Sequence, residues 1–252
     1  MSGFLLNPHC TSGAEVLSQG ETGWRLAIPA GEPGAYRLAQ LDDYRVLRRR
    51  DFVWQPPCTI SLQGRACGKN LPGTWGFGLW NDPFGAGLAH GGTRLLPALP
   101  QAAWFFFASD ENYLSFGDNS PAAGPLAGVF RSPQVPMWPF APLGLALPLL
   151  LIKPVSRLVR RTAAALIQER SVRLTHDVTQ WHQYQIDWLP EMVRFTVDQQ
   201  VVLESEVSPR GPLGLVIWLD NQFAAWRPDG SLNYGTLETS QAWIEIQELR
   251  RT

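Results

Sequence analysis

The fold is decided by two short runs, WHQYQIDWLP at residues 181–190 and VRFTVD at residues 193–198. Apolar and polar residues alternate in both runs, which is the period of a half-buried β-strand. The chain turns between them at Leu189, Pro190 and Glu191. This pattern predicts two antiparallel strands joined by a tight turn.

The same kind of pattern extends to both sides of the hairpin. Further strand candidates cover residues 24–28, 36–38, 59–63, 73–80, 102–108, 215–219 and 243–249. Strands spread from end to end of a chain of 252 residues favour one sandwich over two domains. We therefore expect a single all-β domain over residues 1–252.

The hairpin resembles the signature WHxYxIDWxPxxxxFxVD of family 16 glycoside hydrolases, the laminarinases and lichenases. The resemblance implies a concanavalin A-like jelly-roll β-sandwich. That family cleaves β-glucans with a strand that reads Glu-x-Asp-x-x-Glu, a spacing that this chain lacks. At the corresponding strand the chain has apolar residues from Trp104 to Ala108, and the adjacent Asp110 and Glu111 would point to opposite faces. The resemblance therefore implies the fold without the hydrolytic activity.

The aromatic strand at residues 102–108 suggests the chemistry of a site. Trp104 and Phe106 share one face and would form an apolar wall, which favours a flat, greasy ligand such as a terpenoid, polyketide or lipid. The predicted ligand-binding residues are Trp75, Phe77, Trp80, Asn81, Trp104, Phe106, Trp218, Asn221, Trp226 and Tyr234. An aspartate at the edge of such a wall would have a raised pKa and could transfer a proton. The candidate acids are Asp82, Asp110 and Asp220.

Several functions remain open at this point. The leading prediction is a non-hydrolytic jelly-roll protein that binds an apolar small molecule, as a simple binder or as a cyclase or isomerase. One alternative is a carbohydrate-binding module that has kept the fold and lost the acids. Another is a degenerate β-glucanase, with its carboxylates lost or relocated.

An apolar and amphipathic insert, residues 130–170, interrupts the strand pattern. Its unbroken apolar run, residues 141–152, is shorter than the ~20 residues that span a bilayer. A helical segment, within about residues 137–170, has one stripe of Val155, Leu158, Val159, Leu166 and Ile167. Its other side is basic, with Lys153, Arg157, Arg160, Arg161 and Arg170. We favour a cover or lid whose basic side faces water, with peripheral membrane contact through residues 137–167 as the alternative.

The composition of the chain limits which binding partners, cofactors and cellular location we expect. The chain is 17% charged with a net charge of −1, which excludes a strong global field for nucleic acid. Cys10, Cys58 and Cys67 have no metal-ligand spacing, and no cofactor motif is present, so neither a metal nor a cofactor is predicted. Three thiols and a first stretch without a signal-like apolar core favour a cytoplasmic protein.

Overall fold

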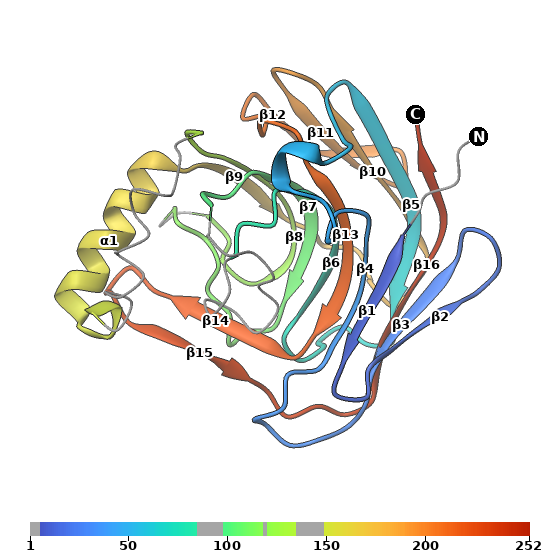
Figure 1. Cartoon of the computed structure of the whole chain (residues 1–252), viewed down its shortest axis with the longest axis horizontal. Coiled ribbons are helices and arrows are strands. Elements are labelled where there is room, and N and C mark those ends of the chain that lie inside the picture. The colour runs from blue at the N-terminus through green and yellow to red at the C-terminus, as the bar shows by residue number, and fades with distance from the viewer. Residues whose placement is uncertain (1–5, 85–97, 118–119, 135–148) are drawn as a thin grey trace.

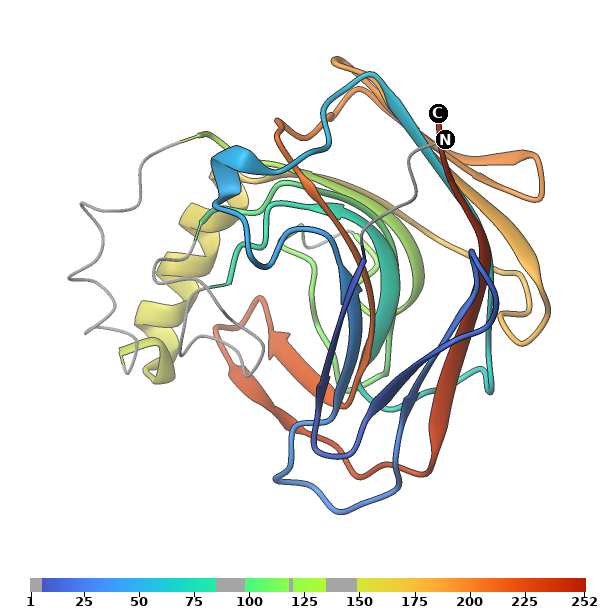
Figure 2. The ribbon, with the colours of Figure 1, turned by 45° about the vertical axis from the view of Figure 1, so that its right-hand side comes forward.

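The computed structural model describes residues 6–84, 98–117, 120–134 and 149–252. Two seven-stranded antiparallel sheets pack face to face, as Figures 1 and 2 show, and the all-β jelly-roll sandwich is confirmed. Sheet A contains, in spatial order, β1 (Asn7–Thr11), β4 (Leu38–Asp42), β13 (Gly214–Asp220), β6 (Thr74–Trp80), β7 (Ala102–Ala108), β8 (Gly124–Arg131) and β9 (Gln168–Arg173). Sheet B contains β12 (Gln200–Ser205), β11 (Val193–Val197), β10 (His182–Trp188), β5 (Cys58–Ala66), β16 (Ala242–Arg251), β3 (Trp24–Ile28) and β2 (Glu15–Ser18).

The predicted hairpin forms β10 and β11 in the expected antiparallel register. Ile186 lies opposite Phe195, and the turn closes where the Leu189 amide donates to the Met192 carbonyl at 2.9 Å. Alternate residues of β10 are buried, and Trp188 is fully covered. The period of two in the sequence therefore places one face of sheet B in the core.

Sheet A divides the aromatic residues of β6 and β7 between its two faces. In the register, Phe77 lies opposite Phe105, and Trp75 lies opposite Phe107 with stacked rings 3.6 Å apart. All four side chains are buried in the core between the sheets. The alternate residues of both strands have their side chains on the other face of sheet A, away from sheet B. This face of the sheet is concave (Figure 1).

The predicted helix is present as α1 (Lys153–Leu166), and the rest of the predicted insert from 135 to 148 lies outside the described residues. In Figure 1, α1 lies at the end of the molecule opposite the two termini, beside a small sheet of β14 (Gln222–Trp226) and β15 (Leu232–Thr236). A short 3-10 helix (Arg49–Asp51) lies between β4 and β5. No helix among these residues is long and apolar enough to cross a membrane.

The orientation of α1 corrects the sequence prediction at Arg160 and along the apolar stripe, whereas the other predicted basic residues, Lys153, Arg157, Arg161 and Arg170, are exposed. Ser156 and Arg160 are buried, whereas Leu158 is 66% exposed and Leu166 is 46% exposed. The physical reason is the surface that α1 covers, which presents polar backbone groups. Arg160 donates to the carbonyls of Trp226 and Ser115, at 3.0 and 3.1 Å. These buried carbonyl groups need hydrogen-bond donors, which apolar side chains cannot supply.

Candidate functional site: the aromatic floor of sheet A

Five aromatic side chains from four neighbouring strands lie together on the concave face of sheet A. We call this set the aromatic floor: Trp80, Trp104, Phe106, Phe130 and Trp218. Trp104 is central, because its ring lies between 5.2 and 6.0 Å from the rings of the other four. Trp80, Trp104, Phe106 and Phe130 are partly exposed, so their rings are available to a ligand.

Strand pairing and glycine explain why these rings can lie side by side. Gly76 separates Trp218 from Phe106 in the register of β13, β6 and β7. A Cβ at Gly76 would lie 2.8 Å from Cη2 of Trp218 and 2.3 Å from the Phe105 carbonyl oxygen. The Trp218 ring therefore rests on bare backbone, which only glycine provides.

Asp220 lies two residues beyond Trp218 on β13, on the same face. Its Oδ1 accepts hydrogen bonds from the Thr74 hydroxyl at 2.9 Å and from the Thr74 amide at 3.2 Å. Its Oδ2 accepts from the Tyr36 hydroxyl at 3.2 Å. Burial raises the pKa of Asp220 to about 7, although these hydrogen bonds act in the opposite direction. A carboxyl group with this pKa can give or accept a proton near neutral pH.

A second polar group borders the floor on β4. Gln40 lies opposite Trp218 in the register and is partly exposed. Its amide nitrogen donates to Asp42 at 2.9 Å, and Asp42 is held by Arg45 at 2.6 Å. These bonds fix the Gln40 amide beside the indole ring of Trp218.

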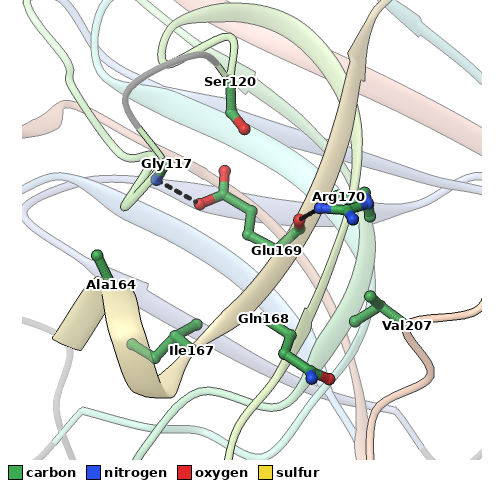
Figure 3. Close-up of a pocket in the computed structure, with 8 residues that line it drawn as sticks. All are labelled: Gly117, Ser120, Ala164, Ile167, Gln168, Glu169, Arg170 and Val207. Carbon is green, nitrogen blue, oxygen red and sulfur yellow. Dashed lines mark hydrogen bonds between the residues drawn. The ribbon is translucent and has the colours of Figure 1, made fainter. Parts of the chain in front are cut away.

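The β9 end of the floor carries Glu169, which lies opposite Phe130. The Glu169 carboxylate accepts hydrogen bonds from the amides of Phe116 and Gly117, at 2.8 and 3.2 Å. It lines a pocket of about 280 Å³ beside the end of α1, and Figure 3 shows its carboxylate pointing toward Gly117. The nearby Ser171 hydroxyl is buried and has no hydrogen-bond partner among the described residues.

The predicted aromatic residues are distributed over both faces of sheet A and its surroundings. Trp80, Trp104, Phe106 and Trp218 come together in the floor, whereas Trp75 and Phe77 lie in the core on the opposite face. Trp226 is on β14 and donates to the Ser156 hydroxyl at 2.8 Å, which attaches α1 to the small sheet. Tyr234, on β15, is 62% exposed.

The side chains of the two predicted asparagines, Asn81 and Asn221, form hydrogen bonds within the fold. Asn81 bonds the Leu99 carbonyl and the Gln101 amide, at 2.9 and 3.0 Å. Asn221 is fully buried, and its side chain accepts from the Arg37 amide at 2.9 Å and donates to the Leu237 carbonyl at 2.9 Å.

Of the three predicted acids, Asp220 lies beside the floor, and burial raises its pKa. Asp82 is buried at the end of β6 with φ of 48°, and its carbonyl accepts from Arg49 at 2.7 Å. Asp110 is exposed in the turn that follows β7. Within the described ranges, no three His, Cys, Asp or Glu residues are grouped so that they could hold a metal ion.

Sequence reasoning missed Phe130 of the floor and the polar residues and tyrosine that border it. Tyr36, Gln40, Phe130, Glu169 and Ser171 come from strands or loops distant in the chain from the aromatic strand. No local motif marks them, because they become neighbours only through the register of β4, β8 and β9.

The comparisons with known proteins support the fold. No protein-family model matches the chain, and no curated protein matches its sequence significantly. The structure is similar to a β-glucanase of Bacillus licheniformis, with 12% identity and a TM-score of 0.51 over 100% of this chain and 94% of that one. It is also similar to a legume lectin-like domain of Entamoeba histolytica, with 12% identity and a TM-score of 0.49 over 98% and 89% of the two chains.

A third similar structure is a family 16 endo-glucanase of Bacteroides ovatus, with 10% identity and a TM-score of 0.47 over 100% and 96% of the two chains. At 12% identity the likeness to the Bacillus licheniformis β-glucanase shows the fold alone. It is the concanavalin A-like jelly roll that the hairpin resemblance implies.

Proposed function

We propose that the aromatic floor binds a carbohydrate without hydrolysing it. The observation that carries the proposal is a row of partly exposed rings with polar side chains at both ends. Trp104 and Phe106 offer flat apolar surface at the centre. Gln40 borders the rings on one side, and Glu169 lies in the pocket at the other.

A sugar ring matches this combination of surfaces. One face of many pyranoses is a plane of C–H groups that packs on an aromatic ring, while the hydroxyls at the edge need fixed hydrogen-bond partners. The Gln40 amide is held by Asp42, so it would be ordered before a ligand arrives. Such preorganisation lowers the entropic cost of binding.

The sequence supports binding without cleavage. A retaining glycosidase needs two carboxyl groups ~5 Å apart, and the Glu-x-Asp-x-x-Glu spacing is not in the chain. On β7 the residues Trp104, Phe106 and Ala108 lie on the face of the sheet that carries the floor, and none of them has a carboxyl group.

An apolar small molecule is the second candidate, and one observation favours it. The centre of the floor consists of aromatic rings, and Asp220 beside it has a pKa raised to about 7. A cyclase or isomerase uses such an arrangement, in which an aromatic wall shapes the ligand and one acid transfers a proton.

Titration calorimetry with soluble β-glucans and with a hydrophobic dye separates the two candidates. Under the proposal, Trp104→Ala weakens glucan binding on the order of tenfold, because a stacking ring at a binding site contributes ~1 to 3 kcal/mol. Trp181→Ala is the matched control, because this partly exposed tryptophan lies outside the floor and packs on Arg65. If no glycan binds and Trp104→Ala weakens only the dye, the second candidate replaces the first.

A further inference from the structure

An apolar surface on α1 and on the residues just before it faces outward from the protein. We call it the outer stripe; its members are 40% to 66% exposed and are Leu149, Leu151, Ile152, Leu158, Val159 and Leu166. A helix on a globular protein ordinarily buries such a stripe against the core. Exposed apolar side chains gathered on one segment indicate contact with something other than the protein's own core.

Polar contacts fix the helix in this orientation. The Ser156 hydroxyl accepts a hydrogen bond from the Trp226 indole at 2.8 Å, and Arg160 donates to two backbone carbonyls. Arg157 donates to the Asp229 carbonyl at 3.0 Å. Turning the stripe toward the sandwich would break all of these bonds, so the outward orientation is built into the fold.

The charge around the outer stripe is positive. The sequence has no Asp or Glu between Asp118 and Glu169, and Lys153, Arg157 and Arg161 are exposed on α1. Asp229 lies near Lys153 and Arg157 and offsets part of this charge. Arg161 follows Leu158 by three residues, so a cation borders the stripe on the solvent side.

We propose that the outer stripe docks on the surface of an anionic lipid bilayer. A short helix with an apolar face and basic flanks lies in the plane of the headgroups, with its apolar side chains reaching the acyl boundary. The charge argues against a second copy of the chain as the occupant, because pairing two stripes would bring like charges together. The helix, 14 residues long, lies on the bilayer and does not cross it.

Vesicle sedimentation tests this proposal with the intact chain. The wild type should sediment with phosphatidylcholine vesicles that contain phosphatidylglycerol, less with phosphatidylcholine alone, and less as salt increases. The double variant Leu158→Glu, Leu166→Glu should reduce partitioning on the order of tenfold or more. Arg161→Glu should reduce it about fivefold or more.

The matched control changes exposed apolar residues elsewhere. Leu17 and Val201 are 47% and 57% exposed on β2 and β12 of sheet B, so Leu17→Glu, Val201→Glu adds the same charge away from α1. Equal melting temperatures of the two double variants would show that both are folded. The proposal is overturned if the wild type ignores anionic vesicles or if the two double variants bind them equally. It is also overturned if the wild type sediments as a dimer that Leu158→Glu, Leu166→Glu dissociates and that has no affinity for vesicles.

Discussion

Asp220 and Thr74 lie opposite each other on β13 and β6, and the Thr74 hydroxyl donates to Oδ1 of Asp220 at 2.9 Å. The same hydroxyl accepts a hydrogen bond from the Trp218 indole at 3.0 Å. One side chain therefore holds both the buried acid and a ring of the aromatic floor.

Replacing that hydroxyl should cost stability. In Thr74→Val the Trp218 indole loses its acceptor, and Asp220 Oδ1 loses one of its donors but keeps the Thr74 amide. Leaving a buried donor such as the indole unpaired costs ~1 to 3 kcal/mol. Thr74→Ser keeps the hydroxyl and is the control. Urea unfolding followed by tryptophan fluorescence should rank Thr74→Val well below Thr74→Ser. Equal midpoints would show that the hydroxyl does not hold the two groups in solution.

Asp220 should make the fold less stable as pH rises. Its pKa is about 7 in the folded state against an ordinary 3.8, so between these values the folded state holds a proton that the unfolded state has lost. The stabilisation of the folded state by the Asp220 proton is therefore complete below about pH 4. It decreases between about pH 4 and about pH 7 and does not change further above that. The difference between the two pKa values sets a loss of about 4 kcal/mol at most. Asp220→Asn should remove this slope from the urea midpoints.

His176 should act in the opposite direction. Burial and, secondly, the neighbouring His182 lower its pKa from 6.5 to about 4, and its Nε2 lies 2.7 Å from the Tyr184 hydroxyl. Between these pKa values the unfolded state binds the extra proton, so stability is complete above pH 6.5 and is lost as pH falls toward 4.

The two slopes overlap, so the single variants separate them. Asp220→Asn should leave stability that rises between pH 4 and 6.5, and His176→Gln should leave stability that falls with pH. Unfolding midpoints measured across this range check both signs. A wild type and two variants with parallel profiles would contradict both pKa assignments.

Arg160 should hold α1 without holding the sandwich. Arg160→Met removes the donors to the Trp226 and Ser115 carbonyls. Amides of α1 should then exchange with deuterium at least tenfold faster, because local opening costs less. Amides of β10 and β11 should keep their protection. Arg157→Met is a milder control, since it removes bonds only at the exposed Asp229 carbonyl. Equal loss of protection in β10 would contradict a local role.

The sequence predicted most of the sandwich because its strands carry a period of two. Residues 182–188, 102–108 and 242–251 alternate or are wholly apolar, and each is a strand. Strands β8, β9 and β12 were not predicted, and the candidate at residues 36–38 meets β4 only at Leu38. The polar sequence of β9, QERSVR, shows no such pattern. It forms through pairing with β8 at the edge of sheet A.

Only part of the candidate site was predicted. The remainder depends on which face of a strand each residue occupies and on the register between strands. Trp75 and Trp80 were grouped together, yet they are five residues apart on one strand and therefore point to opposite faces. Gln40 and Glu169 could not be found, because register brings them to the floor from distant strands. For α1 the hydrophobic period of 3.6 residues separated an apolar face from a basic face, but the period alone does not show which of the two faces is buried.

Because α1 is attached through its polar residues and not through its leucines, the positions that tolerate mutation along the helix differ from those of an ordinary amphipathic helix. Leu158 and Leu166 contribute little to folding, since they are largely exposed, whereas Ser156 and Arg160 hold the helix through buried hydrogen bonds. A scan that scores cellular abundance should therefore accept polar residues at the two leucines and reject apolar ones at Ser156 and Arg160. This is the reverse of the usual substitution pattern of an amphipathic helix. Any intolerance that a functional selection adds at the leucines would then report contact with a partner and not the stability of the fold.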